Sequence, residues 1–278
     1  MARKGVKPNQ SLPTICEQLQ ELQRQRVCNL KSRIMIENRL VATVATASGY
    51  HAGMEEKDRL KRFAEARKII ESVKAGGENE TDAASGLILS TLPAIDGFDG
   101  MVAAYEKEME KLAKQLSVYE WLCKPEQRGF GTLSLAKIIG ECGDLANYPN
   151  PGKLWRRLGC APYTSKGKTL MPSTWRSQKP SLTAAEWEDC GYNPRRRSLA
   201  YLIGEGIVKQ NGEGPYRKRY DASKAKAAAL HDDWKPLRCH RHAMLLATKL
   251  LLKLLWCEWN GYDPHAGEWG EFAHGLYE

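Results

Sequence analysis

Apolar residues recur at helical spacing through the first part of the chain. They run from Leu12 to Val44, mostly three or four positions apart, with a recurrent interval of eleven residues from Leu19 to Leu30 and from Leu30 to Val41. Such spacing predicts one long helix whose apolar seam is of the coiled-coil kind. Two partners suit this seam: the next helix of the same chain, folded back as an antiparallel hairpin, or a second copy of the chain in a homodimer. The spacing does not choose between them.

Helical periodicity continues through the rest of the chain. A second helix is expected at Met54–Lys74, a third at Ser85–Ser117 with a kink or interruption at Pro93 and again near Gly97–Gly100, and a last long one at Arg238–Trp259. No stretch shows a convincing strand pattern, so the predicted fold class is mainly α. The expected parts are a flexible leader (1–11), a coiled-coil and helical domain (12–116), a second helical domain (117–260) and a peripheral tail (261–278).

Positive charge is concentrated in the C-terminal half of the chain. The whole sequence has 42 Lys and Arg against 33 Asp and Glu, a net charge of +9, and 151–260 holds 21 of these basic residues against 9 acidic ones. A field of this sign favours a polyanionic partner, with nucleic acid ahead of a membrane surface. The longest apolar run, Ala243–Trp256, is broken by two lysines and is too short to span a bilayer. No membrane partner is therefore expected.

The eight cysteines indicate a reducing compartment. None forms a Cys-x-x-Cys pair, and the first residues lack the apolar core of a signal peptide. We therefore expect reduced thiols and a cytoplasmic protein. The nearest approach to a metal cluster is Cys239, His240, His242 and Cys257, whose spacing fits no standard zinc pattern. No metal site and no cofactor are predicted in this chain.

The stretch Lys124–Gly143 reads KPEQRGFGTLSLAKIIGECG and predicts a helix, a glycine hairpin and a second helix. Gly129 and Gly131 permit a bend that β-carbons would resist, and they leave amide N–H groups at the start of the following helix. Such a corner suits a phosphate, because free N–H groups and the positive end of the helix dipole both favour an anion. The alternative is a helical turn that merely packs.

Basic residues cluster in three further segments. One is a short helix with Trp155 among its cations, one is a helix that opens at Pro194 with three arginines, and one is the run Tyr216–Tyr220, where tyrosines flank the cations. Arginines in a first helical turn oppose the helix dipole, and an anionic partner would relieve that cost. The residues predicted to contact phosphate are Gly129, Phe130, Gly131, Lys153, Arg156, Arg157, Lys166, Lys168, Arg195, Arg196, Arg197, Arg217, Lys218 and Arg219.

The order of these motifs resembles the C-terminal half of the insertion sequence 110, 116 and 902 transposase family. The series RGFGTLSLAKIIGECGDLANYPNPGKLWRRLGCAPYTSKGK, NPRRRSLAYLIGEGI and HRHAMLLATKLLLKLLW carries the likeness, which extends over about 19–259. Gly129 and Gly131 match the glycines of a helix-hairpin-helix motif, and Gly143-Asp144 and Leu158-Gly159 match later family elements. The resemblance implies a helical DNA-binding domain with a helix-hairpin-helix motif, preceded by a coiled coil.

The chain also departs from this family. Those transposases begin with an RNase H-like domain whose acidic tetrad binds a divalent metal, and no matching segment precedes the coil in this sequence. Arg128 stands where the family has a proline before the hairpin, and Ser165 lies one residue closer to Pro162 than expected.

The resemblance implies DNA transposition or site-specific recombination. Ser165 would then be the nucleophile, with Arg195–Arg197 and Lys166 or Lys168 neutralising the phosphate. A serine hydroxyl needs a base or metal to activate it, so an RNase H-like partner protein carrying Mg²⁺ would act in trans. DNA is the expected partner, a structured guide RNA is a further one that the resemblance leaves open, and the coiled coil implies a homodimer. The alternatives are a non-catalytic DNA-binding regulator derived from a transposase, and a coiled-coil scaffold.

Overall fold

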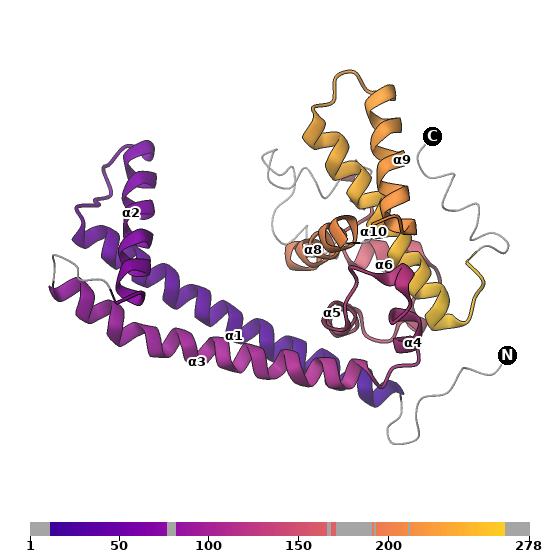
Figure 1. Ribbon diagram of the computed structural model, residues 1–278, viewed down its shortest axis with the longest axis horizontal. Coiled ribbons are helices and arrows are strands. Elements are labelled where there is room, and N and C mark those ends of the chain that lie inside the picture. Colours follow the sequence, from indigo (N-terminus) through magenta and orange to yellow (C-terminus); the bar gives the residue numbers. More distant parts are fainter. Residues whose placement is uncertain are drawn as a thin grey trace. The chain divides into compact units, whose positions relative to one another are not determined.

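The computed structural model describes residues 12–76, 82–165, 168–170, 191, 193–210 and 212–264, and this part of the chain is mainly helical (Figure 1). The predicted fold class, mainly α, is confirmed. The expected leader (1–11) and most of the expected tail lie outside the described residues. The helices are α1 (Leu12–Ala47), α2 (Glu56–Lys74), α3 (Asp82–Ala113), α4 (Tyr119–Leu122), α5 (Thr132–Cys142), α6 (Pro151–Arg157), α8 (Pro194–Gln210), α9 (Pro215–Leu230) and α10 (Pro236–Asn260), with short 3-10 turns η1 (Pro125–Gln127) and η2 (Leu145–Asn147).

A short hairpin is an element that the sequence did not suggest. Strands β1 (Tyr163–Ser165) and β2 (Lys168–Leu170) pair antiparallel, and Ser165 stands opposite Lys168 in the register. Strands of three residues are too short to leave a recognisable alternation in the sequence.

The chain divides into two compact units. The long-helix unit is Leu22–Glu108, and the main unit combines Met1–Glu21 with Met109–Glu278. The boundaries between the units fall inside the continuous helices α1 and α3. The sequence instead predicts a domain boundary between residues 116 and 117. The units are described separately below.

In the long-helix unit, α1 and α3 run antiparallel (Figure 1). Two ion pairs mark their register: Arg26 meets Glu106 at 2.6 Å, and Arg33 meets Asp99 at 2.9 Å. Near the C-terminal end of α1, helix α2 completes a three-helix core with α1 and α3. Its buried members are Leu40, Val41, Val44, Ala45, Ala66, Ile70, Val73, Ile88 and Ile95. This part of the α1 stripe is thus covered by helices of its own chain, although the antiparallel partner marked by the ion pairs is α3 and not the next helix, α2. The homodimer stays a prediction.

Helix α3 does not end at Pro93, although an interruption was one of the two outcomes expected there. The segment Ala84–Ala113 is also long and apolar enough, by length and composition, to cross a membrane. Asp99, within this segment, forms an ion pair with Arg33 of α1.

The main unit is built around α10. Residues of α10 at helical spacing are fully buried, and α6, α8, α9 and η2 pack against them. The backbone of α8 approaches α10 very closely at Gly204, where a β-carbon would lie 2.2 Å from Thr248 Oγ1. Indole groups connect the other elements: Trp155 Nε1 of α6 donates to the Lys249 carbonyl at 3.1 Å, and Trp256 Nε1 of α10 donates to the Tyr148 carbonyl at 2.9 Å.

Helices α5 and α8 of this unit pack antiparallel. Gly129, just before α5, lies against Gly206 near the end of α8, and Glu141 near the end of α5 meets Arg195 and Arg196 at the start of α8. We call the first contact the glycine end of this helix pair and the second the arginine end.

Candidate nucleic-acid interface

The glycine end is a contact between two backbones. Gly129 has a φ of 93°, and a β-carbon there would lie 2.7 Å from the Gly206 carbonyl oxygen and 2.8 Å from Ile207 Cα. Gly206 is restricted in return, since its β-carbon would lie 3.0 Å from the Gly129 carbonyl oxygen. Gly131 differs, because a β-carbon there meets nothing within 4 Å. Only the first of the two predicted hairpin glycines is therefore demanded by packing and backbone conformation.

Part of the predicted phosphate-binding turn is occupied by internal contacts. The Phe130 amide donates to the Gln127 carbonyl at 2.9 Å, and the Phe130 ring is buried against Trp121 in an edge-to-face arrangement. The amides that remain for a ligand belong to the first turn of α5, because its N-cap Gly131 has no side chain to satisfy them.

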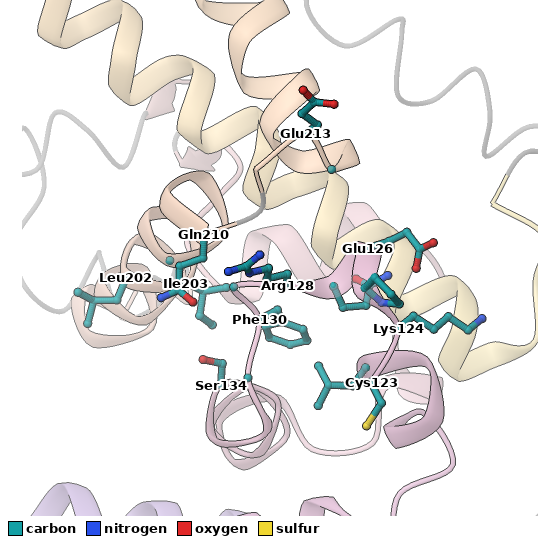
Figure 2. Close-up of a pocket in the computed structure, with 17 residues that line it drawn as sticks. Cys123, Lys124, Glu126, Arg128, Phe130, Ser134, Leu202, Ile203, Gln210 and Glu213 are labelled. Atoms are coloured by element: carbon teal, nitrogen blue, oxygen red, sulfur yellow. The ribbon is translucent and has the colours of Figure 1, made fainter.

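An open cleft of about 900 Å³ lies beside this turn (Figure 2). Its walls come from the α4–α5 connection, from α8, and from the residues that lead into α9. Apolar side chains such as Leu122, Leu202 and Ile203 line it together with polar ones, among them Gln127 and Ser134. A space of this size and mixed character is typical of sites for small molecules.

The arginine end is organised around one buried carboxylate. The Glu141 side chain is 3% exposed, and its Oε2 lies 2.9 Å from Arg195 Nη2 and 3.1 Å from Arg196 Nε. Arg157 at the end of α6 reaches the Glu141 carbonyl oxygen with Nε and Nη2, both at 3.3 Å. We call Arg157, Arg195, Arg196 and Arg197 the arginine cluster.

The arginine cluster explains how α8 tolerates cations at its first turn. The sequence predicts an anionic partner there, and Glu141 of α5 is such a partner within the chain. The Asn193 side chain caps the helix, accepting from the Arg195 amide at 3.0 Å. Arg197 Nη1 approaches Cys160 Sγ at 3.8 Å instead. The Glu141 carboxylate pairs directly with Arg195 and Arg196 only, so positive charge remains on the surface at this end of α8.

Thiols at the arginine end are held protonated. Burial raises the pKa of Cys142 to about 12, although Arg157 and Arg196 nearby act in the opposite direction. Burial also raises the pKa of Cys160, against the attraction of Arg197 and Lys249. Neither sulfur is therefore a nucleophile at neutral pH. The seven described cysteines are all free, and the described residues contain no group of three or more His, Cys, Asp or Glu that could hold a metal ion.

The basic run of α9 is only partly available to a ligand. Tyr216 and Tyr220 are buried, so neither ring can stack on a base or sugar. Arg217 is paired with Asp221 at 2.9 Å, while Lys218 is exposed and Arg219 is half-buried. In α6, Trp155 is likewise buried, Arg156 is half-buried and Lys153 is exposed.

Ser165 ends β1, shortly after α6 in the chain. The side chains of Ser165 and Lys168 lie outside what the structure describes, as does the whole of Lys166. The structure therefore brings together Arg157 and Arg195–Arg197 at one end of the helix pair and Gly129–Gly131 at the other, and it leaves the serine loop unassigned to either.

Sequence reasoning missed Glu141, Gly206 and Gln127. Glu141 stands three positions after Ile138, on the buried face of α5, and an acidic residue at such a position is a recognisable signal for an internal cation. Gly206 and Gln127 left no signal, because their partners come from distant parts of the sequence. Comparisons with protein-family models, with curated proteins and with solved structures gave no match.

Proposed function

We propose that this chain binds the phosphate backbone of nucleic acid across the α5 and α8 pair. The observation that carries the proposal is the arginine cluster, in which Arg195 and Arg196 pair with the Glu141 carboxylate, Arg157 contacts the Glu141 backbone carbonyl, and Arg195 remains 42% exposed. Guanidinium groups fixed in this way are suited to phosphate oxygens, because their donors match two oxygens at once. The net charge of +9 agrees with a polyanionic partner.

The two ends of the helix pair would make two separate backbone contacts. Helix α5 has 11 residues, so its ends are ~16 Å apart at 1.5 Å per residue. That distance corresponds to about five base pairs of axial rise, at 3.4 Å for each step along one strand. Arginines would hold one phosphate, and the uncapped amides of α5 would hold another. The turn and the two flanking helices would then act as the helix-hairpin-helix motif of the proposed DNA-binding domain.

Within this proposal the protein acts in DNA transposition or recombination. The support is the ordered series of motifs from Gly129 to the last long helix, which resembles the insertion sequence 110, 116 and 902 transposases. Ser165 is the proposed nucleophile, activated by a metal-bearing RNase H-like partner. Replacing Ser165 by Ala is expected to abolish strand transfer and to leave DNA binding intact. DNA binding without any strand transfer by the wild type would instead favour the non-catalytic regulator, and strand transfer retained in the Ser165→Ala variant would contradict the role of Ser165.

Salt dependence tests the binding step. The logarithm of the association constant for duplex DNA should fall steeply and linearly with the logarithm of salt concentration. Arg195→Gln should lower the magnitude of that slope by about one. The matched control is Arg62→Gln in the long-helix unit. The Arg62 side chain is 43% exposed and paired with Glu65, and the Arg195 side chain is 42% exposed and paired with Glu141. A flat salt profile, or equal effects of the two substitutions, would contradict the proposal.

A further inference from the structure

The cleft beside the glycine end is larger and more apolar than a phosphate contact requires. Its volume is about 900 Å³, and Leu122, Leu202 and Ile203 contribute to its walls. Leu202 is 62% exposed, a large exposure for a leucine, and Figure 2 shows its side chain at the outer margin of the cleft. Phosphate oxygens gain nothing from such a wall, whereas a flat nucleobase gains contact with it.

A buried amide adds hydrogen-bonding capacity to this cleft. Gln127 is 4% exposed and lines the cleft, and its Oε1 accepts the hydroxyl hydrogen of the fully buried Tyr216. That bond orients the amide, whose Nε2 carries two N–H donors. A donor held in this orientation at the cleft suits a ligand that carries a carbonyl oxygen or a ring nitrogen.

Charged side chains of both signs line the cleft, with Lys124 and Arg128 on one hand and Glu126 and Glu213 on the other. Figure 2 shows the carboxyl groups of Glu126 and Glu213 directed away from the middle of the cleft, where the ring of Phe130 and the side chain of Arg128 lie. Ser134, in the first turn of α5, also lines the cleft, next to the uncapped amides of that helix. Donors for a phosphate and a wall for a base thus lie side by side.

From these observations we infer that the cleft takes one unpaired nucleotide of a bound strand. Its phosphate lies at the first turn of α5, its base lies against the wall formed by Leu202 and Ile203, and the Gln127 Nε2 donates to a carbonyl oxygen of the base. A paired base in a duplex is stacked and cannot enter such a cleft. The inference rests on the proposed function, and it narrows the ligand to DNA that contains an unpaired or displaced nucleotide.

Three duplex probes separate the base from the backbone. One is fully paired, one carries a single unpaired thymidine, and one carries an abasic nucleotide at the same place, so that backbone flexibility is the same in the last two. Fluorescence anisotropy should give about tenfold tighter binding of the thymidine probe than of the abasic probe, the size of one base contact with a side-chain wall. Equal affinity for these two probes overturns the inference and leaves the proposed function standing. No binding to any probe at low salt overturns both.

Two exposed leucines provide matched variants for the wall. Leu202→Glu places a charge on the cleft wall and should reduce the preference for thymidine over abasic to about one. Leu230→Glu in α9, where the leucine is 65% exposed and outside the cleft, should keep the tenfold preference. A preference retained in Leu202→Glu, or lost equally in both variants, contradicts the placement of the base.

The amide is tested by removing both partners of its hydrogen bond. The double variant Gln127→Met with Tyr216→Phe keeps the buried volume and leaves no unsatisfied group, so the fold should survive. Its preference for thymidine should fall several-fold below that of Tyr216→Phe alone, which retains the amide. Equal preference in the double and single variants would show that Gln127 does not contact the base.

Discussion

The glycine end and the arginine end join the same two helices, α5 and α8, by opposite means. At the glycine end the contact is bare backbone, with no space for a single additional carbon at Gly129. At the arginine end long side chains converge on Glu141, those from α8 on its buried carboxylate and that of Arg157 from α6 on its backbone carbonyl. The first contact is rigid and specific in shape, and the second is specific in charge. The sequence predicts phosphate binding at both ends of the helix pair. At the glycine end, Gly129 is required for packing. At the arginine end, the positive charge is partly neutralised by Glu141 of the same chain.

Replacing Gly129 by Ala should have the largest effect on stability. The substitution places a β-carbon 2.7 Å from the Gly206 carbonyl oxygen, at a φ of 93° that L-residues rarely adopt. We expect a loss of about 3 kcal/mol or more in the free energy of unfolding, since strain and overlap add. Urea denaturation followed by circular dichroism measures it. Gly131→Ala is the matched control, with open space around its β-carbon and an expected loss below about 1 kcal/mol. Equal losses would remove the distinction between the two glycines.

Replacing Glu141 by Gln tests the arginine end. The amide leaves Arg195 and Arg196 without their carboxylate at a site where Glu141 itself is buried, and we expect a loss of about 2 kcal/mol in the free energy of unfolding. The control is Glu205→Gln in the same α8 helix, whose partner Lys209 is 69% exposed and whose loss should stay below about 0.5 kcal/mol. If both substitutions cost the same, Glu141 is not the organising group. On the proposed function, Glu141→Gln should also strengthen DNA binding, because a competing negative charge is gone.

The pH dependence of the free energy of unfolding tests whether water is excluded from the Cys142 thiol at the arginine end. Burial raises the pKa of Cys142 from 9.0 to about 12 in the folded chain. Between these two values the unfolded thiol has released its proton while the folded thiol retains it, so the free energy of unfolding falls as pH rises. The stability difference between wild type and Cys142→Ala should therefore shrink by about 1 kcal/mol between pH 7 and pH 10. Cys28→Ala, which removes an exposed thiol, is the control. An unchanged difference for Cys142→Ala would indicate that water reaches this end.

The long elements of the fold could be predicted from the sequence, and their partners could not. Apolar spacing located α1, α2, α3 and α10, because a buried face repeats with the helical period over many turns. Pro93 was overestimated as a breaker, since the exposed side of a helix with tertiary support accommodates proline within it. The hairpin of β1 and β2 was missed because six residues carry no period.

The candidate site could likewise be predicted only in part from the sequence. The basic residues of the arginine cluster were visible as local runs, but their carboxylate lies 54 positions away from Arg195 in the sequence. Tyr216 and Tyr220 flank three cations in the sequence, a setting typical of surface residues, yet both are buried. Local pattern identifies which residues carry charge, and only the packing of α5, α8 and α10 decides which of them face outward.

Glu141 can also be regarded as a ligand that never dissociates. The fold holds its carboxylate within 3.1 Å of two guanidinium groups, so its interaction with them is intramolecular, whereas a phosphate must be recruited from solution. The chain is consequently able to keep its arginines assembled without nucleic acid. A phosphate that arrives at the cluster shares those donors with a resident competitor, and its complex should form readily and release quickly.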